Sequence, residues 1–351
     1  MKSVYIHIPF CHTICTYCDF PKVFRNDDWI NKYLKKLKDE IKENYKGELI
    51  ETLYIGGGTP SSLNIKQLIK LFEIIKIFNI KKDAEITLEA NSEDLTEEKL
   101  LFLKGKINRL SIGVQTFNDR LLKIMNRTVN IPNIKNAFKY FENINIDLMY
   151  GFNEENPRIL KQDLIEILKL KPAHISTYNL ILEPNTILYI KGYNLKNEDT
   201  TYEKIINKYL KDYSHYEISN YALKGYESKH NLMYWNNERY YGFGLGASGY
   251  INNERYDNTR SITKYLNGEY RYITHTLDET ETLQNEFILG FRKIHGISKA
   301  NFKNKYQKDI KDIEIIQVLL KQNLLKENDT NIYINSKYIY VSNEILVKFL
   351  S

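Results

Sequence analysis

Strand-like segments alternate with helix-like segments through the first half of the chain, and this alternation restricts the fold more than any other feature. The strand-like segments are rich in β-branched and aromatic residues and cover residues 4–8, 49–56, 85–90, 109–115, 143–151 and 174–181. The helix-like segments have apolar residues at helical spacing and cover residues 29–45, 65–78, 95–104, 118–125, 132–141 and 157–170. Such alternation is typical of a parallel sheet with crossover helices. We therefore expect an α/β fold, as an open or partial (β/α)6 barrel of the TIM type.

The pattern changes in the second half of the chain. Residues 216–222 are a further strand candidate, and residues 225–259 are rich in Gly, Tyr and Asn and are expected to be irregular. Residues 332–342 are a hairpin candidate that follows further helical segments. We expect three parts, namely a barrel core at 1–222, an irregular segment at 223–275 and a small C-terminal helical, winged-helix-like domain at 276–351.

Composition and charge exclude several classes of protein. The 351 residues are enough to bury a large core. The net charge is +6, but the basic residues are spread along the whole chain, so nucleic acid is not an expected partner. The N-terminus lacks the apolar stretch of a secretory signal, and no apolar run approaches the about 20 residues that a membrane helix needs. We expect a cytoplasmic protein that is not an integral membrane protein.

All three cysteines of the chain lie in one short segment, as Cys11, Cys15 and Cys18. An odd number of closely spaced cysteines argues against a disulfide framework. Thiolates are soft ligands that suit iron–sulfur clusters or zinc. Three ligands on a four-iron cluster leave one iron open for a small molecule. The spacing alone also permits a zinc site with His7 or His12 as the fourth ligand, although such sites usually join two distant ligand loops.

Glycines and polar residues follow several of the expected strands. They are Gly56 to Thr59 after the second strand, Glu89 after the third, Gln115 after the fourth and Asp147 in the fifth. In α/β barrels the chemistry takes place at the carboxyl ends of the strands. Glycines let backbone groups approach a ligand closely, and the Lys-Ser/Thr ending of a phosphate-binding P-loop is absent. We expect these residues to meet at one site.

A series of motifs resembles the radical SAM proteins. The segment YIHIPFCHTICTYCDF at residues 5–20 is similar to the signature of that superfamily. Further matching motifs follow in order up to residue 250: LYIGGGTPS, LEANSEDL, RLSIGVQTF, NRTVN, IDLMYG, HISTYNL, YEISNYA, HNLMYW and GFGLGAS. Together they resemble the branch that contains oxygen-independent coproporphyrinogen III dehydrogenases and haem chaperones of the HemW type.

The resemblance implies a set of cofactors and the residues that hold them. It implies a [4Fe-4S] cluster on Cys11, Cys15 and Cys18, with S-adenosylmethionine (SAM) bound to the open iron. An electron donor would reduce the cluster, and SAM would yield a 5′-deoxyadenosyl radical. The positions that match SAM contacts in the family are Tyr5, Tyr17, Gly57, Gly58, Thr59, Glu89, Gln115, Arg127, Asp147 and Ile181.

Three features favour the chaperones over the dehydrogenases within this branch. The dehydrogenases have a further cysteine at the position of Phe20, and they have a long segment before the cysteine loop. They also lack the motif HNLMYW, which stands here at residues 230–235. Histidine is a common axial ligand of haem iron, and the resemblance assigns haem binding to His230.

The function expected from the sequence is therefore a haem chaperone. It would bind the cluster, SAM and haem, and deliver haem to an acceptor protein associated with a membrane. The alternative is an oxygen-independent coproporphyrinogen III dehydrogenase that forms protoporphyrinogen IX. One departure from the family pattern is the segment FNEEN at residues 152–156, where the family usually has Leu-Pro-x-Gln.

Overall fold

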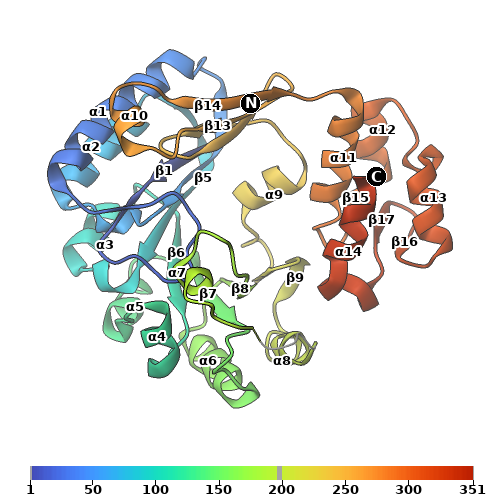
Figure 1. Cartoon of the computed structure of the whole chain (residues 1–351), viewed down its shortest axis with the longest axis horizontal. Helices are drawn as coiled ribbons and strands as arrows, with labels where there is room; N and C mark the ends of the chain where they lie inside the picture. Colours follow the sequence, from blue (N-terminus) through green and yellow to red (C-terminus); the bar gives the residue numbers. More distant parts are fainter. Residues whose placement is uncertain (1, 196–199, 351) are drawn as a thin grey trace. The chain divides into compact units, whose positions relative to one another are not determined.

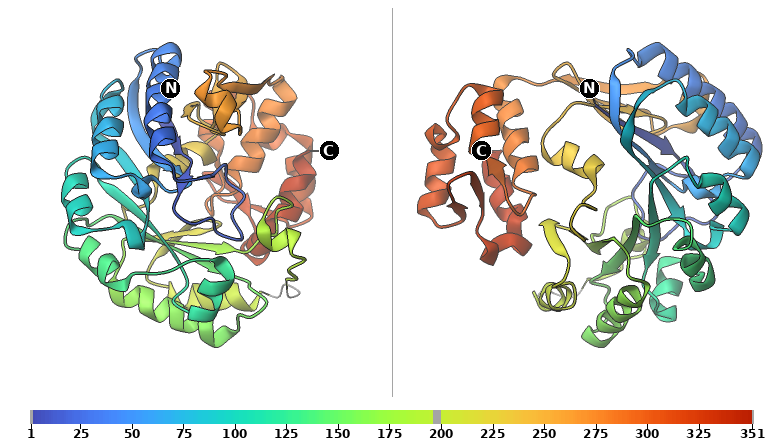
Figure 2. Two further views of the ribbon diagram at one scale, coloured as in Figure 1. Left: turned by 60° about the vertical axis from the view of Figure 1, so that its left-hand side comes forward. Right: turned by 180° about the vertical axis from the view of Figure 1, so that it is seen from behind.

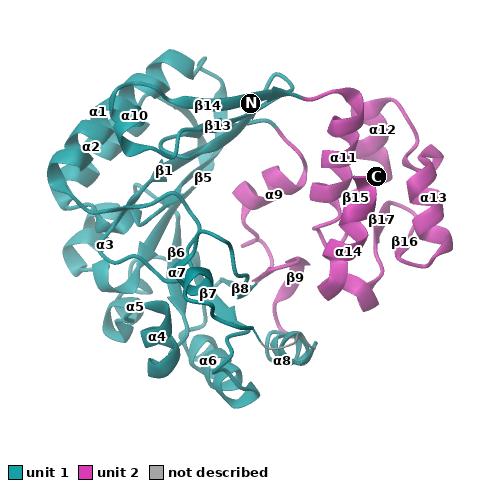
Figure 3. Ribbon diagram, viewed as in Figure 1, with its two compact units in different colours: residues 1–210, 239–276 teal, residues 211–238, 277–351 magenta. Residues whose placement is uncertain are grey.

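The computed structural model describes residues 2–195 and 200–350 and divides the chain into two compact units (Figures 1 and 3). Unit 1 comprises Met1–Leu210 and Arg239–Thr276, and unit 2 comprises Lys211–Glu238 and Leu277–Ser351. These units are defined by internal packing. The boundaries of the three domains drawn from the sequence stay a prediction.

Unit 1 is built on a sheet whose central strands are parallel. In spatial order these are β1 (Ser3–Ile8), β4 (Leu49–Gly57), β5 (Asn79–Asn91), β6 (Arg109–Gln115), β7 (Ile144–Tyr150) and β8 (His174–Asn179). Each of them pairs in parallel with the next along the chain. This order confirms the α/β fold, and all the carboxyl ends of these strands lie at one edge.

Crossover helices surround these strands, as Figure 2 shows. They are α1 (Asp27–Asn44), α2 (Ile65–Ile75), α3 (Glu97–Leu103), α4 (Asp119–Met125), α5 (Ile131–Ala137) and α6 (Pro157–Leu170). Each begins at an Asn or Thr whose side chain accepts a backbone N–H of the first turn, which satisfies a donor that the helix cannot. The shorter helices α7 (Ile187–Ile190) and α8 (Thr201–Tyr209) follow β8.

The expectation of an irregular segment at 225–259 is wrong. In unit 1 this region forms β11 (Tyr240–Phe243), β12 (Ser248–Ile251) and β13 (Glu254–Asn258), and α10 (Ile262–Leu266) and β14 (Arg271–Thr276) follow. Strand β11 pairs in parallel with β1, and the later strands extend the sheet as an antiparallel meander. The glycines serve close packing here, since a Cβ on Gly242 would lie 1.8 Å from Ser248 O. Asn252 and Asn253 have positive φ values in the turn between β12 and β13, which is typical of hairpin turns.

A buried glutamate in α1 connects this extension to the barrel. Glu40 is fully buried and accepts hydrogen bonds from Gly244 N (2.9 Å), Asn258 Nδ2 (2.6 Å) and Tyr265 Oη (2.6 Å). Burial is the main cause of the raised pKa of Glu40. Because each donor is itself buried, the carboxyl group holds the loop after β11 against α1.

Unit 2 combines a helical module with one three-stranded sheet and an antiparallel pair of strands. Its elements are β9 (Ser214–Glu217), β10 (Asn220–Ala222), α9 (Lys229–Trp235), α11 (Glu279–Gly290), β15 (Ile297–Ser298), α12 (Lys299–Tyr306), α13 (Glu314–Lys321), β16 (Leu325–Glu327), β17 (Asn331–Ile334) and α14 (Ser342–Leu346). Strands β15, β17 and β16 form an antiparallel sheet beside the helices, in agreement with the expected winged-helix-like architecture. Stacked phenylalanines, among them Phe287 and Phe291, fill its core.

Two expectations for unit 2 need correction. The candidate strand at 216–222 is an antiparallel pair, because β9 and β10 are joined by a tight turn. The hairpin expected at 332–342 is displaced, because β17 pairs with the preceding β16, and Ser336–Val341 forms a 3-10 helix. Among the described residues, no helix combines the length and the apolar character that crossing a membrane requires.

Candidate cluster and cofactor site

The cysteine loop follows β1 and is closed at its base by two short parallel strands. They are β2 (Phe10–Cys11) and β3 (Val23–Phe24). Backbone bonds fix the closure, since Val23 N donates to Pro9 O (2.8 Å) and Arg25 N donates to Cys11 O (2.9 Å). The two ends of the cysteine loop are therefore held side by side at the edge of the barrel.

The tip of the same loop is bound to the end of α4. Thr16 donates its backbone N–H to Met125 O (3.1 Å) and its hydroxyl to Ile124 O (2.7 Å). Asn126 Nδ2 in turn donates to Ile14 O (3.0 Å). The last carbonyl groups of a helix have no partners within the helix. Here the cysteine loop supplies hydrogen-bond donors to two of them.

A cavity of about 450 Å³ opens beside the loop at the carboxyl ends of the strands. Cys11, Cys15 and Cys18 all line it. Most of the residues expected to contact SAM also line it, namely Tyr17, Gly57, Gly58, Thr59, Glu89, Gln115, Arg127, Asp147 and Ile181. The cavity thus brings together residues from seven separate segments of the sequence.

Two expected site residues are not among those that line the cavity. Tyr5 is not among the residues that line the cavity, and its hydroxyl contacts His7 Nδ1 (3.0 Å) instead. His230 belongs to unit 2. The roles that the family resemblance gives to these residues stay predictions.

The thiols fit a cluster better than a single zinc ion. His7 is buried and both ring nitrogens are engaged, with Tyr5 Oη and with Pro21 O (2.7 Å), and burial lowers its pKa to about 4. His12 faces Asp94, with 3.5 Å between Nε2 and Oδ1. In the described part of the chain, no three His, Cys, Asp or Glu side chains converge as ligands of one ion. The cysteines of a four-iron cluster bind different irons around a cube, which suits thiols that line the wall of a cavity.

Two polar side chains donate toward the thiols. Arg127 Nη1 donates to Cys15 Sγ (3.4 Å), and Thr59 Oγ1 lies 3.4 Å from Cys11 Sγ. Burial raises the pKa of the Cys11 thiol to about 11. Donors aimed at sulfur favour the thiolate form, which is the form that binds metal.

The glycine turn after β4 forms one wall of the cavity. Gly57 has a φ of +120° and donates its N–H to Glu89 Oε2 (3.0 Å). Gly58 leaves no room for a side chain, because a Cβ there would lie 2.6 Å from the carbonyl carbon of Pro9 and 2.9 Å from Cys11 Sγ. The turn therefore brings bare backbone against the cysteine loop.

Two carboxyl groups lie deep in this site. Glu89 accepts from Tyr54 Oη (2.7 Å) as well as from Gly57, and burial is the main cause that raises its pKa to about 7. Asp147 accepts from Asn145 Nδ2 (2.8 Å), and burial also raises its pKa. Such shifted carboxyl groups in a cavity are typical of functional sites.

Gln115 is strained and has an unused polar atom. Its φ of +68° lies in the left-handed region, which a residue with a side chain rarely adopts. Its Oε1 is buried and has no hydrogen-bond partner in the structure. An unsatisfied acceptor on a strained residue at a cavity wall fits a site for a ligand with hydroxyl or amino groups.

Sequence reasoning missed Asn91, which lines the cavity at the end of β5. Its side chain contacts Arg127 and Thr59. The residue stands within the motif LEANSEDL, but an asparagine two positions after a glutamate has no distinctive spacing. Only the fold reveals its neighbours.

The segment that departs from the family pattern is well packed. Phe152 is fully buried in a cluster with Leu121 and Met125, against which Tyr17 of the cysteine loop also packs. Glu155 is buried and accepts from Gly151 N (2.6 Å). The altered segment therefore contributes to the apolar cluster against which the cysteine loop packs through Tyr17.

The motif at 230–235 forms helix α9 in unit 2. His230 is 1% exposed, and its Nε2 lies 2.8 Å from Tyr234 Oη one turn further along the helix. Arg292 lies over the Trp235 ring, with 4.6 Å between Cζ and the ring centroid. Both aromatic residues of the motif are thus held within unit 2.

Comparisons with known proteins agree with this geometry. The family model of the Radical SAM superfamily matches residues 5–167. The solved structure of the coproporphyrinogen III oxidase HemN from Escherichia coli is similar with a TM-score of 0.84 at 21% identity, covering 99% of this chain and 90% of that one. At that identity the likeness shows the fold alone. The chain is a radical SAM protein.

Curated relatives place it more narrowly. The haem chaperone HemW of Lactococcus lactis is 38% identical and covers 99% of this chain and 97% of its own length. HemW of Bacillus subtilis is 37% identical over 100% of this chain and 99% of its own length. HemW of Escherichia coli is 30% identical, with 86% and 85% covered. This chain belongs to the HemW family.

The glycine turn gives a prediction about stability. We expect Gly58→Ala to lower the free energy of unfolding by about 2–3 kcal/mol, because the new Cβ would overlap the Pro9 backbone, which cannot move cheaply. Urea unfolding of the metal-free protein measures this. Gly105→Ala is the control, because nothing lies within 4 Å of its Cβ and only its positive φ costs about 1 kcal/mol. An equal loss in the two variants would contradict the overlap.

Proposed function

We propose that this protein is a haem chaperone that binds a [4Fe-4S] cluster, SAM and haem and passes haem to an acceptor protein. The main support is the joint placement of three thiols and nine SAM-contact positions around one cavity, in a chain related to HemW proteins over its whole length. The acceptor is proposed to be associated with a membrane, and the chaperone to act in the cytoplasm with an electron donor for its cluster.

In this proposal Cys11, Cys15 and Cys18 hold the cluster. The bound cluster supplies an open iron and a single electron for cleavage of a sulfonium. The chain itself orients the ligand. Glu89 is suited to the SAM ammonium and Arg127 to its carboxylate, because each carries the opposite charge.

The remaining cavity residues suit the nucleoside part of SAM. Gln115 and Asp147 can accept hydrogen bonds from ribose hydroxyls through their oxygens. Ile181 is 64% exposed beside the cavity and offers apolar surface to a base.

The cluster can be tested by metal content. We expect anaerobic reconstitution to give about four irons per chain, and the triple variant Cys11→Ser, Cys15→Ser, Cys18→Ser to retain almost none. Iron and zinc analysis with absorption spectra of both proteins measures this. One zinc and no iron in the wild type would contradict the cluster.

Glu89 makes SAM binding depend on pH. The titratable groups that face it include Tyr5, Tyr54, Asp147 and Arg109. With a pKa of about 7, Glu89 is largely protonated at pH 6 and must lose that proton to pair with the ammonium. We therefore expect the dissociation constant for SAM to decrease roughly fivefold from pH 6 to about pH 7.5, and to stop decreasing near pH 8, where the α-amino group of SAM begins to lose its own proton.

Anaerobic calorimetry on the reconstituted protein measures this dependence. Glu89→Gln should bind SAM more weakly and without the pH slope. Glu93→Gln is the matched control, because Glu93 is exposed and is not among the residues that line the cavity. A slope that survives in Glu89→Gln would assign it to another group.

The proposed haem ligand is protected in this structure. Its Nε2 contacts the Tyr234 hydroxyl, and the imidazole is buried. Haem iron needs a ring nitrogen with a free lone pair. In this proposal the contact between His230 and Tyr234 opens when His230 binds iron through Nε2.

Haem titrations test this site. His230→Ala should weaken binding and remove the spectral features of histidine ligation. Tyr234→Phe should bind haem about three- to tenfold more tightly, since one hydrogen bond of about 1 kcal/mol no longer opposes ligation. Unchanged spectra and affinity in His230→Ala would show that this residue is not a haem ligand.

An activity assay tests the alternative function. The reduced, reconstituted protein is incubated with SAM and coproporphyrinogen III, and formation of protoporphyrinogen IX would favour the dehydrogenase.

A further inference from the structure

We propose that Asn91 is a positioning residue for the cluster, because its single amide group orients the donors that reach two of the three thiols. The inference rests on the proposed cluster at Cys11, Cys15 and Cys18. It adds a residue that contacts none of the thiols itself.

The oxygen of the Asn91 amide holds Arg127. Its Oδ1 accepts from Arg127 Nη2 at 2.9 Å, and Nη1 of the same guanidinium donates to Cys15 Sγ at 3.4 Å. Nη2 also donates to Gly113 O (2.7 Å). Arginine has only donors, so the oxygen of the amide must face it. The planar guanidinium is thereby fixed in the orientation that points Nη1 at sulfur.

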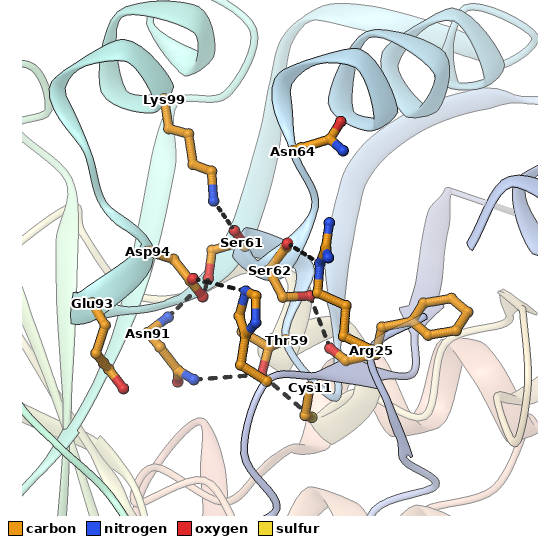
Figure 4. A network of polar contacts seen from close by, with 12 residues as sticks. Cys11, Arg25, Thr59, Ser61, Ser62, Asn64, Asn91, Glu93, Asp94 and Lys99 are labelled. Atoms are coloured by element: carbon orange, nitrogen blue, oxygen red, sulfur yellow. Dashed lines mark hydrogen bonds and ion pairs between the residues drawn. The ribbon is translucent and has the colours of Figure 1, made fainter. Parts of the chain in front are cut away.

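The nitrogen of the same amide faces Thr59. Asn91 Nδ2 lies 3.5 Å from Thr59 Oγ1, which lies 3.4 Å from Cys11 Sγ (Figure 4). Gly58 O, at 2.7 Å, competes for the single hydroxyl proton. The contact of Asn91 with Thr59 is longer than its contact with Arg127. We therefore expect Arg127 to account for the larger part of the effect of Asn91 on the cluster.

A second layer of bonds fixes Asn91. Its backbone N donates to Ser61 Oγ (3.0 Å), and Ser61 Oγ donates to Asp94 Oδ2 (2.9 Å) (Figure 4). Lys99 Nζ donates to Ser61 O (2.6 Å). Ser61 and Asp94 lie in the 3-10 helices Pro60–Ser62 and Ser92–Asp94, and Lys99 lies in α3. Asn91 is therefore held between two strand ends, and its amide has a defined direction.

Donors to cluster sulfur stabilise the more negative, reduced state and raise the reduction potential. Without Asn91, Arg127 Nη2 keeps Gly113 O as an acceptor but loses the second acceptor that fixes the direction of the guanidinium. We expect Asn91→Ala to reduce the equilibrium constant for one-electron reduction about tenfold, which corresponds to about 59 mV toward more negative potential.

The experiment compares reconstituted variants by iron content, midpoint potential and the EPR spectrum of the reduced cluster. Asn133→Ala is the matched control, because Asn133 Nδ2 donates to Ser92 O (2.9 Å) in the same segment and no contact to a thiol or its donors is involved. We expect Asn91→Ala to keep its iron and shift its potential and EPR spectrum, and Asn133→Ala to match the wild type.

A double-variant cycle with Arg127→Ala separates positioning from general damage. If Asn91 acts mainly through Arg127, most of the shift caused by Asn91→Ala disappears when Arg127 is already absent. Asn91→Ser serves the same cycle should Asn91→Ala not fold. Equal potentials in wild type and Asn91→Ala, equal shifts in Asn91→Ala and Asn133→Ala, or an undiminished shift in the Arg127→Ala background would each overturn the proposal. Absence of iron from the wild type would instead overturn the proposed cluster.

Discussion

The site depends on the hydrogen bonds that tie the cysteine loop to the C-terminal end of α4. Thr16 satisfies the carbonyls of Ile124 and Met125, which the helix itself leaves open. The chain then passes through Asn126, in the left-handed conformation, to Arg127. One helix end therefore fixes both the thiol loop and the guanidinium that donates to it. Loop and donor cannot shift independently, and that suits a cluster whose properties follow its sulfur contacts.

The sequence predicted the parallel core because its two periodicities are distinct. Buried parallel strands read as short apolar runs, and the intervening helices carry apolar residues every three to four positions. The meander after β11 was missed for a physical reason. Gly242 and Gly249 stand where neighbouring strands and Tyr256 approach too closely for a side chain. The glycine content that suggested an irregular segment therefore allows close packing between strands. The shifted hairpin near residue 334 arises because Asn335 caps a 3-10 helix where a second strand was expected.

Much of the cavity was predictable because parallel strands end at one edge. Residues from separate motifs, such as Thr59, Glu89 and Gln115, had to meet there once the order of strands was known. Tyr5 was assigned from a motif alone, its hydroxyl lies against His7, and its role stays a prediction. Asn91 shows the converse. Its importance comes from two partners on different elements, which no local pattern encodes.

The burial of His230 agrees with a carrier better than with a permanent haem protein. A carrier must release its cargo, so the bound state can exceed the free state by only a limited free energy. In the free state the imidazole contacts the Tyr234 hydroxyl within the same helix, so loss of haem need not leave a buried ring nitrogen unsatisfied. The Arg292 contact with Trp235 lies on the next residue of that helix and does not use His230. In the proposed transfer, haem could therefore leave His230 while the helix keeps this anchor.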